Sequence, residues 1–262
     1  NLFFHSSSVT SLVALIILLG DANAQVASSF LPGTSYPIGT QPEDLAIFDA
    51  NSDGRLDFVT ANVLSDSLTM RFGDGFGGFA VSTNIVTGSW PTGVTAVDLN
   101  NDGKADLAVS NYNDGTLQTL LGNGTGAFST YTVQTSGFQP AESASADLNG
   151  DGFIDIAVAN YTWSNYVTVL LGDGLGSFTS ETQFTTGNRP GGIVIGDMNS
   201  DGSLDLVVAN GSSHTVSILT GSGTGQFSAA VYFPIPAQPG RIGLADFNSD
   251  GAGNFNQSVA TA

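Results

Sequence analysis

Residues 147–155 read Asp-Leu-Asn-Gly-Asp-Gly-Phe-Ile-Asp, a nine-residue phrase that recurs along the chain. Its pattern is Asp, any residue, Asn, any residue, Asp, Gly, two variable residues, and then an acid or an amide. The copies begin at Asp49, Asp98, Asp147, Asp197 and Asp246, which are 49, 49, 50 and 49 residues apart. A fixed period of this length predicts an array of repeated units. Its regularity favours one array over independent domains.

Each unit has the character of four short strands. In the third unit, residues 141–146 are small and half apolar, and residues 154–159 form an apolar run typical of a buried strand. Residues 166–171 form another apolar run, and residues 178–184 alternate in character after a glycine-rich turn. Four short strands with turns between them, within roughly 50 residues, are typical of a propeller blade. We therefore predict an all-β fold, a β-propeller of four-stranded blades.

Proline and phenylalanine keep the same phase in every repeat. A Pro stands seven residues before each opening Asp, at Pro42, Pro91, Pro140, Pro190 and Pro239. A Phe stands twelve residues before each Pro, at Phe30, Phe79, Phe128, Phe178 and Phe227. We interpret these Phe side chains as packing between blades.

This phase predicts four whole blades, at residues 42–90, 91–139, 140–189 and 190–238, and a partial fifth at 239–262. Residues 30–39 match a lone fourth strand, which is suited to closing the ring by pairing with an incomplete last blade. In the fifth repeat, residues 252–256 read Ala-Gly-Asn-Phe-Asn where an apolar second strand is expected. We therefore expect little of the fifth blade beyond its first strand and its loop.

The phrase is rich in oxygen ligands suited to a hard cation. Positions one, three and five place carboxylate or amide oxygens on one side of a tight turn, and Gly at position six permits the bend. Position seven offers a backbone carbonyl, and Asp at position nine can bind with both oxygens. All-oxygen ligands at this number favour Ca²⁺ over Zn²⁺, and Mg²⁺ demands a stricter octahedron. Without a cation, three carboxylates so close together would repel one another.

We predict about four Ca²⁺ sites on this pattern. The side-chain ligands are Asp49, Asn51, Asp53 and Asp57; Asp98, Asn100, Asp102 and Asp106; Asp147, Asn149, Asp151 and Asp155; and Asp197, Asn199, Asp201 and Asp205. The backbone-carbonyl ligands are those of Arg55, Lys104, Phe153 and Ser203. A single copy of the phrase could equally be a hairpin turn without metal, but five copies in phase favour the metal site.

The fifth phrase is an incomplete site. It supplies Asp246, Asn248 and Asp250, but Asn254 replaces the Asp at position nine. We expect this site to bind Ca²⁺ weakly or not at all.

The loops, together with Leu-Gly-Asn-Gly-Thr-Gly-Ala-Phe at residues 121–128, resemble the FG-GAP or VCBS repeats of integrin α-subunit propellers and of many secreted bacterial proteins. The resemblance covers about residues 30–251. It implies calcium loops on the outer edge or lower face of a seven-bladed propeller. Because this chain has four whole repeats and part of a fifth, the resemblance also implies a fragment of a larger propeller.

The charge is concentrated in the loops. Asp and Glu outnumber Lys and Arg by 23 to 5, which gives a net charge of −18, and fourteen of these acids lie inside the five phrases. So acidic a chain is not expected to bind nucleic acid, because too few cationic side chains are present to neutralise phosphates. The chain has no Cys, which excludes disulfides and thiolate chemistry.

The N-terminal residues predict secretion. A short apolar run at residues 12–19 is followed by Ala22-Asn23-Ala24, which resembles a signal peptide, incomplete at its N-terminus, that is cleaved after residue 24. The alternative is a disordered apolar leader. The run is too short to span a bilayer, and no other segment predicts a membrane span.

We expect a secreted, non-catalytic propeller that binds an extracellular protein or a glycan, as in cell adhesion. The alternatives are a lectin that binds sugars between its blades and the propeller part of a secreted carbohydrate-active enzyme. Trp90, Trp163, Tyr112 and Tyr161 lie near blade turns, where they could stack on a sugar, although each alone is more typical of packing. An enzyme is disfavoured because the only His residues are His5 and His214, and no nucleophile motif is present.

Overall fold

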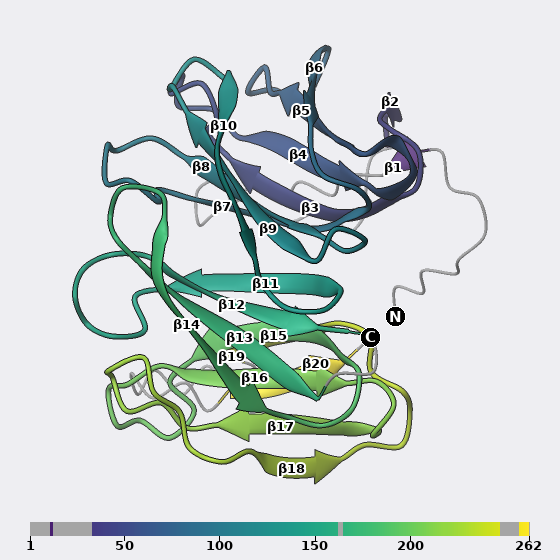
Figure 1. Ribbon diagram of the computed structural model, residues 1–262. Helices are drawn as coiled ribbons and strands as arrows, with labels where there is room; N and C mark the ends of the chain where they lie inside the picture. The colour runs from purple at the N-terminus through teal and green to yellow at the C-terminus, as the bar shows by residue number, and fades with distance from the viewer. Residues whose placement is uncertain (1–10, 13–32, 162–164, 247–256, 262) are drawn as a thin grey trace, which may run out of the picture.

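The protein is built from small antiparallel β-sheets arranged around an axis. The computed structural model describes residues 11–12, 33–161, 165–246 and 257–261 (Figure 1). Four sheets have four strands each, joined in sequence order; a fifth sheet that continues the array has two strands, and a further two-stranded sheet is formed by residues 11–12 and 36–37. The period of the sheets is the period of the nine-residue phrase, which confirms the prediction of an all-β array of four-stranded blades.

Each sheet contains an inner, a middle, a third and an outer strand. The first sheet contains β3 (Pro42–Phe48), β4 (Asp57–Asn62), β5 (Ser67–Phe72) and β6 (Val81–Val86). The second contains β7 (Pro91–Val97), β8 (Asp106–Asn111), β9 (Thr116–Gly122) and β10 (Phe128–Thr135). The third contains β11 (Pro140–Ala146), β12 (Asp155–Asn160), β13 (Tyr166–Gly172) and β14 (Phe178–Thr185). The fourth contains β15 (Pro190–Gly196), β16 (Asp205–Asn210), β17 (Thr215–Leu219) and β18 (Val231–Pro234).

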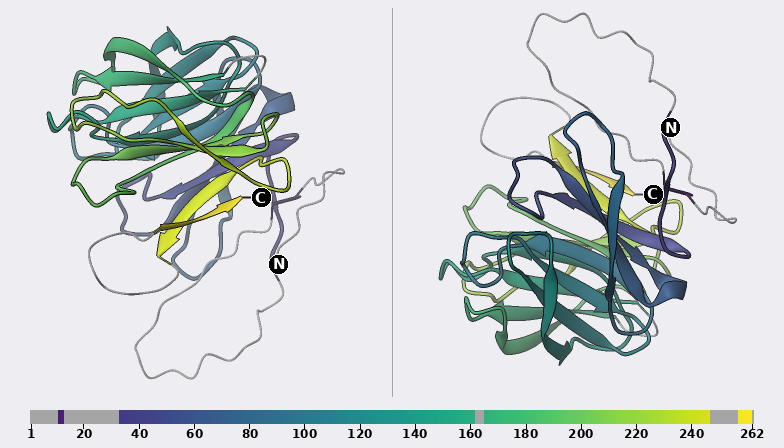
Figure 2. Two further views of the ribbon diagram at one scale, coloured as in Figure 1. Left: turned by 90° about the horizontal axis from the view of Figure 1, so that it is seen from below. Right: turned by 90° about the horizontal axis from the view of Figure 1, so that it is seen from above.

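Burial follows the order of the strands. All six residues of each middle strand are buried, whereas the outer strands β6 and β18 are almost entirely exposed. The middle strands read as near-continuous small or apolar runs because both of their faces are covered by neighbouring sheets. The sheets fan out around the axis (Figure 2), so the inner strands of successive sheets lie beside one another.

Hydrophobic clusters between neighbouring sheets hold the array together. Between the first and second sheets, Leu68 and Met70 pack with Leu107 and Val109, all of them completely shielded from solvent. Equivalent clusters join the second sheet to the third, the third to the fourth, and the fourth to the fifth. Burial of one such side chain contributes about 1.5–3 kcal/mol, so these clusters stabilise the packing of one blade on the next.

Three of the Phe slots pack between blades as predicted, whereas Phe79 packs against Phe58 of its own blade and Tyr36. Phe79 is buried, and the rings of Phe128, Phe178 and Phe227 pack against the clusters between sheets. Phe30 lies outside the described residues.

The two ends of the array differ from expectation. Within residues 30–39, the described part contains only a two-residue strand, β2 (Tyr36–Pro37), and it pairs with β1 (Ser11–Leu12), not with the last blade. In the fifth repeat a second strand does exist. This strand, β20 (Gln257–Thr261), pairs with β19 (Ile242–Asp246). It begins three residues later than the repeat predicts, which is why residues 252–256 gave no strand signal.

The other residues predicted as a leader, and the C-terminal residues 247–256, lie outside the described part of the chain. In the part that the structure describes, no helix has the length and apolar character needed to cross a bilayer.

Candidate functional site: the acidic loops and the axial pocket

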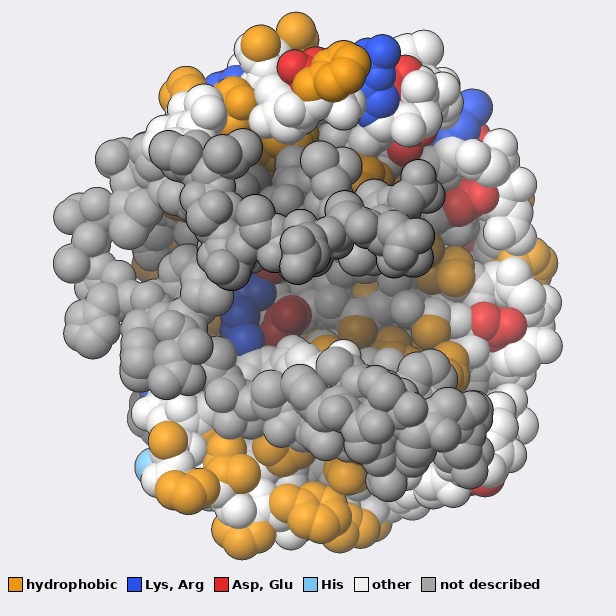
Figure 3. All heavy atoms as spheres, turned by 180° about the vertical axis from the view of Figure 1, so that it is seen from behind, with side chains coloured by type: hydrophobic (Ala, Val, Ile, Leu, Met, Phe, Trp, Pro, Cys, Tyr) orange, Lys and Arg blue, Asp and Glu red, His pale blue; other side chains and the backbone are white. Residues whose placement is uncertain are grey.

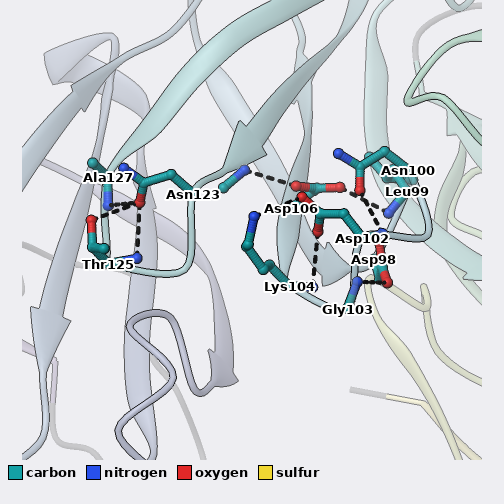
Figure 4. Close-up of polar contacts among 11 residues, drawn as sticks. Asp98, Leu99, Asn100, Asp102, Gly103, Lys104, Asp106, Asn123, Thr125 and Ala127 are labelled. Carbon is teal, nitrogen blue, oxygen red and sulfur yellow. Dashed lines mark hydrogen bonds and ion pairs between the residues drawn. The ribbon is translucent and has the colours of Figure 1, made fainter.

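Each acidic loop connects an inner strand to a middle strand and is shaped by its own side chains. In the second loop, Asp98 accepts hydrogen bonds from the backbone N–H of Asp102 at 3.2 Å and of Gly103 at 2.8 Å. Asn100 Oδ1 also accepts from the N–H of Asp102, at 3.1 Å. These bonds turn the side-chain oxygens of positions one and three toward the centre of the loop (Figure 4).

The fourth residue of the loop adopts a left-handed backbone in each described copy. It is Ser52, Asn101 or Ser200, with φ between 57° and 65°, and Gly150 in the third loop. Small or amide residues tolerate this region best. The loop sequence therefore favours the observed turn even without a cation.

Position nine has a second role that the sequence did not reveal. Asp106 is fully buried at the start of β8, and it accepts the N–H of Leu99 at 3.0 Å and that of Gly122 at 2.7 Å. Burial raises the pKa of this carboxyl above its usual range, the two N–H bonds offset part of that rise, and the charges of Asp102 and Asp98 add to it. Asp106 thus ties its own loop to the end of β9.

The same arrangement recurs in all four described loops. The residues that match Asp106 are Asp57, Asp155 and Asp205, each fully buried and each accepting two backbone N–H bonds. Burial raises the pKa of each of these carboxyls, and the charges of the two acids in the same loop raise it further. Three carboxyl groups are thus close enough to repel one another.

The described loops can supply a Ca²⁺ donor set of oxygens. Positions one, three and five offer a half-buried carboxylate, an amide and an exposed carboxylate, in that order. Each oxygen at position nine keeps a lone pair beyond its one N–H bond. Among the described residues, no group of three or more Asp, Glu, His or Cys side chains stands in the arrangement of a metal cluster.

Position seven differs between the loops. Lys104 Nζ lies 3.1 Å from Asp102 Oδ2, and Arg55 lies 3.8 Å from Asp53 Oδ2. Phe153 and Ser203 occupy the same place in the other two loops, and each donates its backbone N–H to the Asp two residues before it. The fifth phrase, with Asn248 and Asp250, lies outside the described residues, and the side chain of Asp246 is not described.

Neighbouring blades meet at these loops. The N–H of Gly126, in the β9–β10 turn of the second blade, donates to the carbonyl of Ala50 in the first loop at 3.0 Å. Gly176 donates in the same way to Leu99, at 3.1 Å, and Gly225 donates to Leu148, at 3.0 Å. Each of the first three loops is therefore held by the blade that follows it.

A second region with functional character lies where the inner strands begin. A pocket of about 330 Å³ there is lined by residues of several blades, among them Trp90, Tyr112, Tyr161, Glu142 and Arg241. The sequence singled out three of these aromatic residues, and the structure brings them together. Trp163 lies outside the described residues, and His214 is an exposed turn residue between β16 and β17.

Comparison with protein families finds one match, to the FG-GAP-like repeat, four times in overlapping stretches at residues 49–109, 98–158, 147–208 and 197–253. A comparison with curated proteins found no match.

Solved structures share the fold at low identity. One is a functionally unknown protein from Desulfotomaculum acetoxidans, with a TM-score of 0.61, 15% identity, and coverage of 80% of this chain and 62% of that one. A putative 6-phosphogluconolactonase from Bacteroides fragilis has a TM-score of 0.58 and 16% identity, with coverage of 79% of this chain and 57% of that one. BBS1N, solved in complex with ARL6DN, has a TM-score of 0.56 and 15% identity, with coverage of 79% of this chain and 61% of that one. The chain thus spans about three fifths of the length of the solved structures that it matches.

Proposed function

The chain belongs to the FG-GAP-like repeat family, and from this premise we propose that it is a secreted, non-catalytic, calcium-binding propeller that presents its surface to an extracellular protein or glycan. The observation that carries the proposal is the donor set of the acidic loops. In each of the four described loops, carboxylates at positions one and five and an amide oxygen at position three belong to one turn, beside the buried carboxyl at position nine.

A bound Ca²⁺ would supply charge neutralisation and a cross-link. The loop residues Asp98, Asn100 and Asp102 would hold it from one side, and Asp106 would hold it from the start of β8. Burial is the main cause of the raised pKa of Asp106, and the cation would offset the repulsion from Asp102 and Asp98 that adds to it. Its role is structural, because it joins the inner and middle strands of one blade.

The expected gain in stability is large for a domain of this size. Extracellular modules bind Ca²⁺ with dissociation constants of about 10⁻⁴ to 10⁻³ M. At tenfold excess over such a constant, one site adds about 1.4 kcal/mol to the free energy of unfolding. Four such sites together approach the whole stability margin of a typical domain.

Thermal melting under a calcium titration tests this proposal. The melting temperature should rise with Ca²⁺, rise much less with Mg²⁺, and return to its starting value with chelator. Asp151→Asn, in the third loop, should reduce the calcium-dependent shift by about a quarter. A melting temperature that ignores both Ca²⁺ and chelator would refute calcium binding.

The non-catalytic part of the proposal rests on the absence of a catalytic pattern in the sequence and on His214, which is exposed in a turn and does not line the pocket. Likeness to a putative lactonase at 16% identity supports the fold only. Robust hydrolysis of lactones or glycosides by the purified chain, reduced by substitution of Glu142, would overturn this part.

Secretion is tested separately. Expression of the gene with its native N-terminus should place a chain that begins at Gln25 outside the cell. A retained chain that keeps residues 1–24 would contradict the secretory part of the proposal.

A further inference from the structure

A ring of strained residues marks the end of the axis where the inner strands begin. The residue just before the repeated Pro adopts a left-handed backbone in all four whole blades, with φ of 55° to 59°, at Gln41, Trp90, Gln139 and Arg189. None of them is Gly. Such a conformation costs of the order of 1–3 kcal/mol per residue and concentrates at functional sites.

Each strained residue pairs with the residue that follows a middle strand. The N–H of Tyr112 donates to the carbonyl of Trp90 at 2.9 Å, and the N–H of Tyr161 donates to that of Gln139 at 3.0 Å. The same bond joins Val63 to Gln41, and Gly211 to Arg189.

These two slots vary between blades, unlike the loop, Pro and Phe positions that define the repeat. The loop residues, the Pro and the Phe recur in each blade, but the paired slots hold Gln and Val, then Trp and Tyr, then Gln and Tyr, then Arg and Gly. A fixed backbone that carries different side chains around one opening is a frame for recognition, since packing alone would accept the same residues each time.

The aromatic side chains form one wall of the pocket. The rings of Trp90 and Tyr112 are stacked at 26° with their centroids 6.0 Å apart, and Tyr161 follows at 6.2 Å from Tyr112. Trp90 is 40% exposed, which is unusual for so large an apolar side chain. Arg189 lies over the ring of Tyr161 at 4.3 Å and donates to its hydroxyl at 2.6 Å, which fixes the end of the wall.

Polar groups from three blades form the other wall. Glu142 lies in a bulge of β11, where the register with β12 skips from Pro140 to Ser143, and bulges re-aim side chains. Arg241 Nη1 lies 2.8 Å from Asp44 and 3.6 Å from Glu142. A hollow on the rear face combines basic, acidic and apolar side chains (Figure 3).

We propose that this axial pocket binds a neutral, hydroxylated ring, that is, a sugar residue of a glycan. The stacked aromatic wall suits the C–H face of such a ring, and the pocket volume is within the range of small-molecule sites. The opposite wall offers carboxyl acceptors and guanidinium donors for hydroxyl groups. A charged ligand fits less well, because an anion would face Glu43 and Glu142, and a cation would face Arg241.

This inference deepens the glycan side of the proposed function and places the sugar at the axis, not between blades. Its test measures sugar binding, not calcium binding. Failure of the calcium titration would leave the pocket standing, and failure of sugar binding would leave the calcium loops standing.

The test is glycan-array screening of the full chain in calcium, followed by calorimetric titration of the best monosaccharide. Trp90→Gly removes the stacking ring and also relieves the left-handed backbone, so the variant should fold. Gln139→Gly is the matched control, because it relieves the same backbone strain but Gln139 does not line the pocket.

Trp90→Gly should weaken sugar binding at least tenfold, whereas Gln139→Gly should leave it within twofold, and both variants should still unfold in one cooperative thermal transition. If no saccharide binds the parent chain, or if Trp90→Gly binds sugar as well as Gln139→Gly does, the proposal is overturned. A parallel titration with a choline-type cation separates the alternative of a cation-binding aromatic cage.

Discussion

At the scale of single residues, the carboxyl at position nine has a structural role besides the calcium-ligand role that we propose for it. Asp106 accepts two backbone N–H bonds from different parts of its blade while it stands beside two other acids. The spacing of the nine-residue motif predicts the role of this Asp as a ligand, but it does not predict its structural role. The partner N–H of Gly122 is 16 residues away, beyond any local pattern.

Asp106→Asn should therefore destabilise the protein even in chelator. The new NH₂ group must face one of the two N–H donors, so a buried hydrogen bond is lost, at a cost of about 1–3 kcal/mol in the free energy of unfolding. Asp102→Asn, at an exposed position of the same loop, should cost little in chelator. Chemical denaturation of both variants, with and without Ca²⁺, checks this, and equal effects in chelator would contradict a structural role for Asp106.

Glu142 gives a pH dependence that does not involve the loops. Burial raises its pKa from 4.5 to about 7, Arg241 opposes that rise, and Asp44 adds to it; Glu43 also lies near Arg241. Since the pKa is raised in the folded state, the related stability is fully present below pH 4.5 and is lost as the pH rises through about 7.

Replacement of Glu142 by Gln should remove this loss. The variant should gain stability relative to the parent between pH 4.5 and pH 8, by up to about 3 kcal/mol, because one pKa unit corresponds to about 1.36 kcal/mol. The comparison is made at constant Ca²⁺, so that titration of the loops cancels between the two proteins. A difference between parent and variant that does not change with pH would show that Glu142 is ionised throughout.

At the scale of the strand and turn, glycine decides how closely one element approaches another. A Cβ on Gly122, at the end of β9, would lie 2.1 Å from the carbonyl oxygen of Ala105, and Gly73, Gly172 and Gly221 meet equivalent carbonyls at 2.0 to 2.2 Å. From the sequence we expect a glycine-rich turn at this place. The structure shows that Gly is required here chiefly because two backbone segments approach each other closely.

Gly122→Ala should therefore destabilise the second blade by several kcal/mol, since rigid backbone cannot make room. Gly243→Ala, in β19, is the control, because a Cβ there meets nothing within 4 Å. Thermal melting of both variants checks the expectation, and equal melting temperatures would contradict it.

Most of the strand pattern could be predicted from the sequence because apolar runs, turns and the Pro and Phe slots agree with one another. The shift of β20 could not, because its position depends on pairing with β19 and not on the repeat. The left-handed backbone at Gln41, Trp90, Gln139 and Arg189 was also missed. A residue before Pro normally prefers extended backbone, so local rules point the other way.

At the scale of the whole molecule, the first and last blades meet through Arg241. This side chain, just before β19, contacts Asp44 of the first sheet and Glu142 of the third. No periodic pattern in the sequence predicts a contact between residues 197 positions apart. The axial pocket was missed for the same reason, since its residues are brought together only by the curvature of the array.

The backbone hydrogen bonds from Gly126, Gly176 and Gly225 to the preceding loops bear on whether the proposed calcium sites would bind Ca²⁺ independently. The turn that carries Gly126 also packs on Lys104 of its own loop, as a Cβ on Gly124 would lie 2.9 Å from the Lys104 Cδ. One loop thus contacts the next through a single rigid turn. A Ca²⁺ ion that orders one loop would also restrict the next loop through this turn and so raise its affinity. Calcium binding should therefore be cooperative along the array. Calorimetric titration should give a Hill coefficient above 1, and a simple hyperbola would show that the blades respond independently.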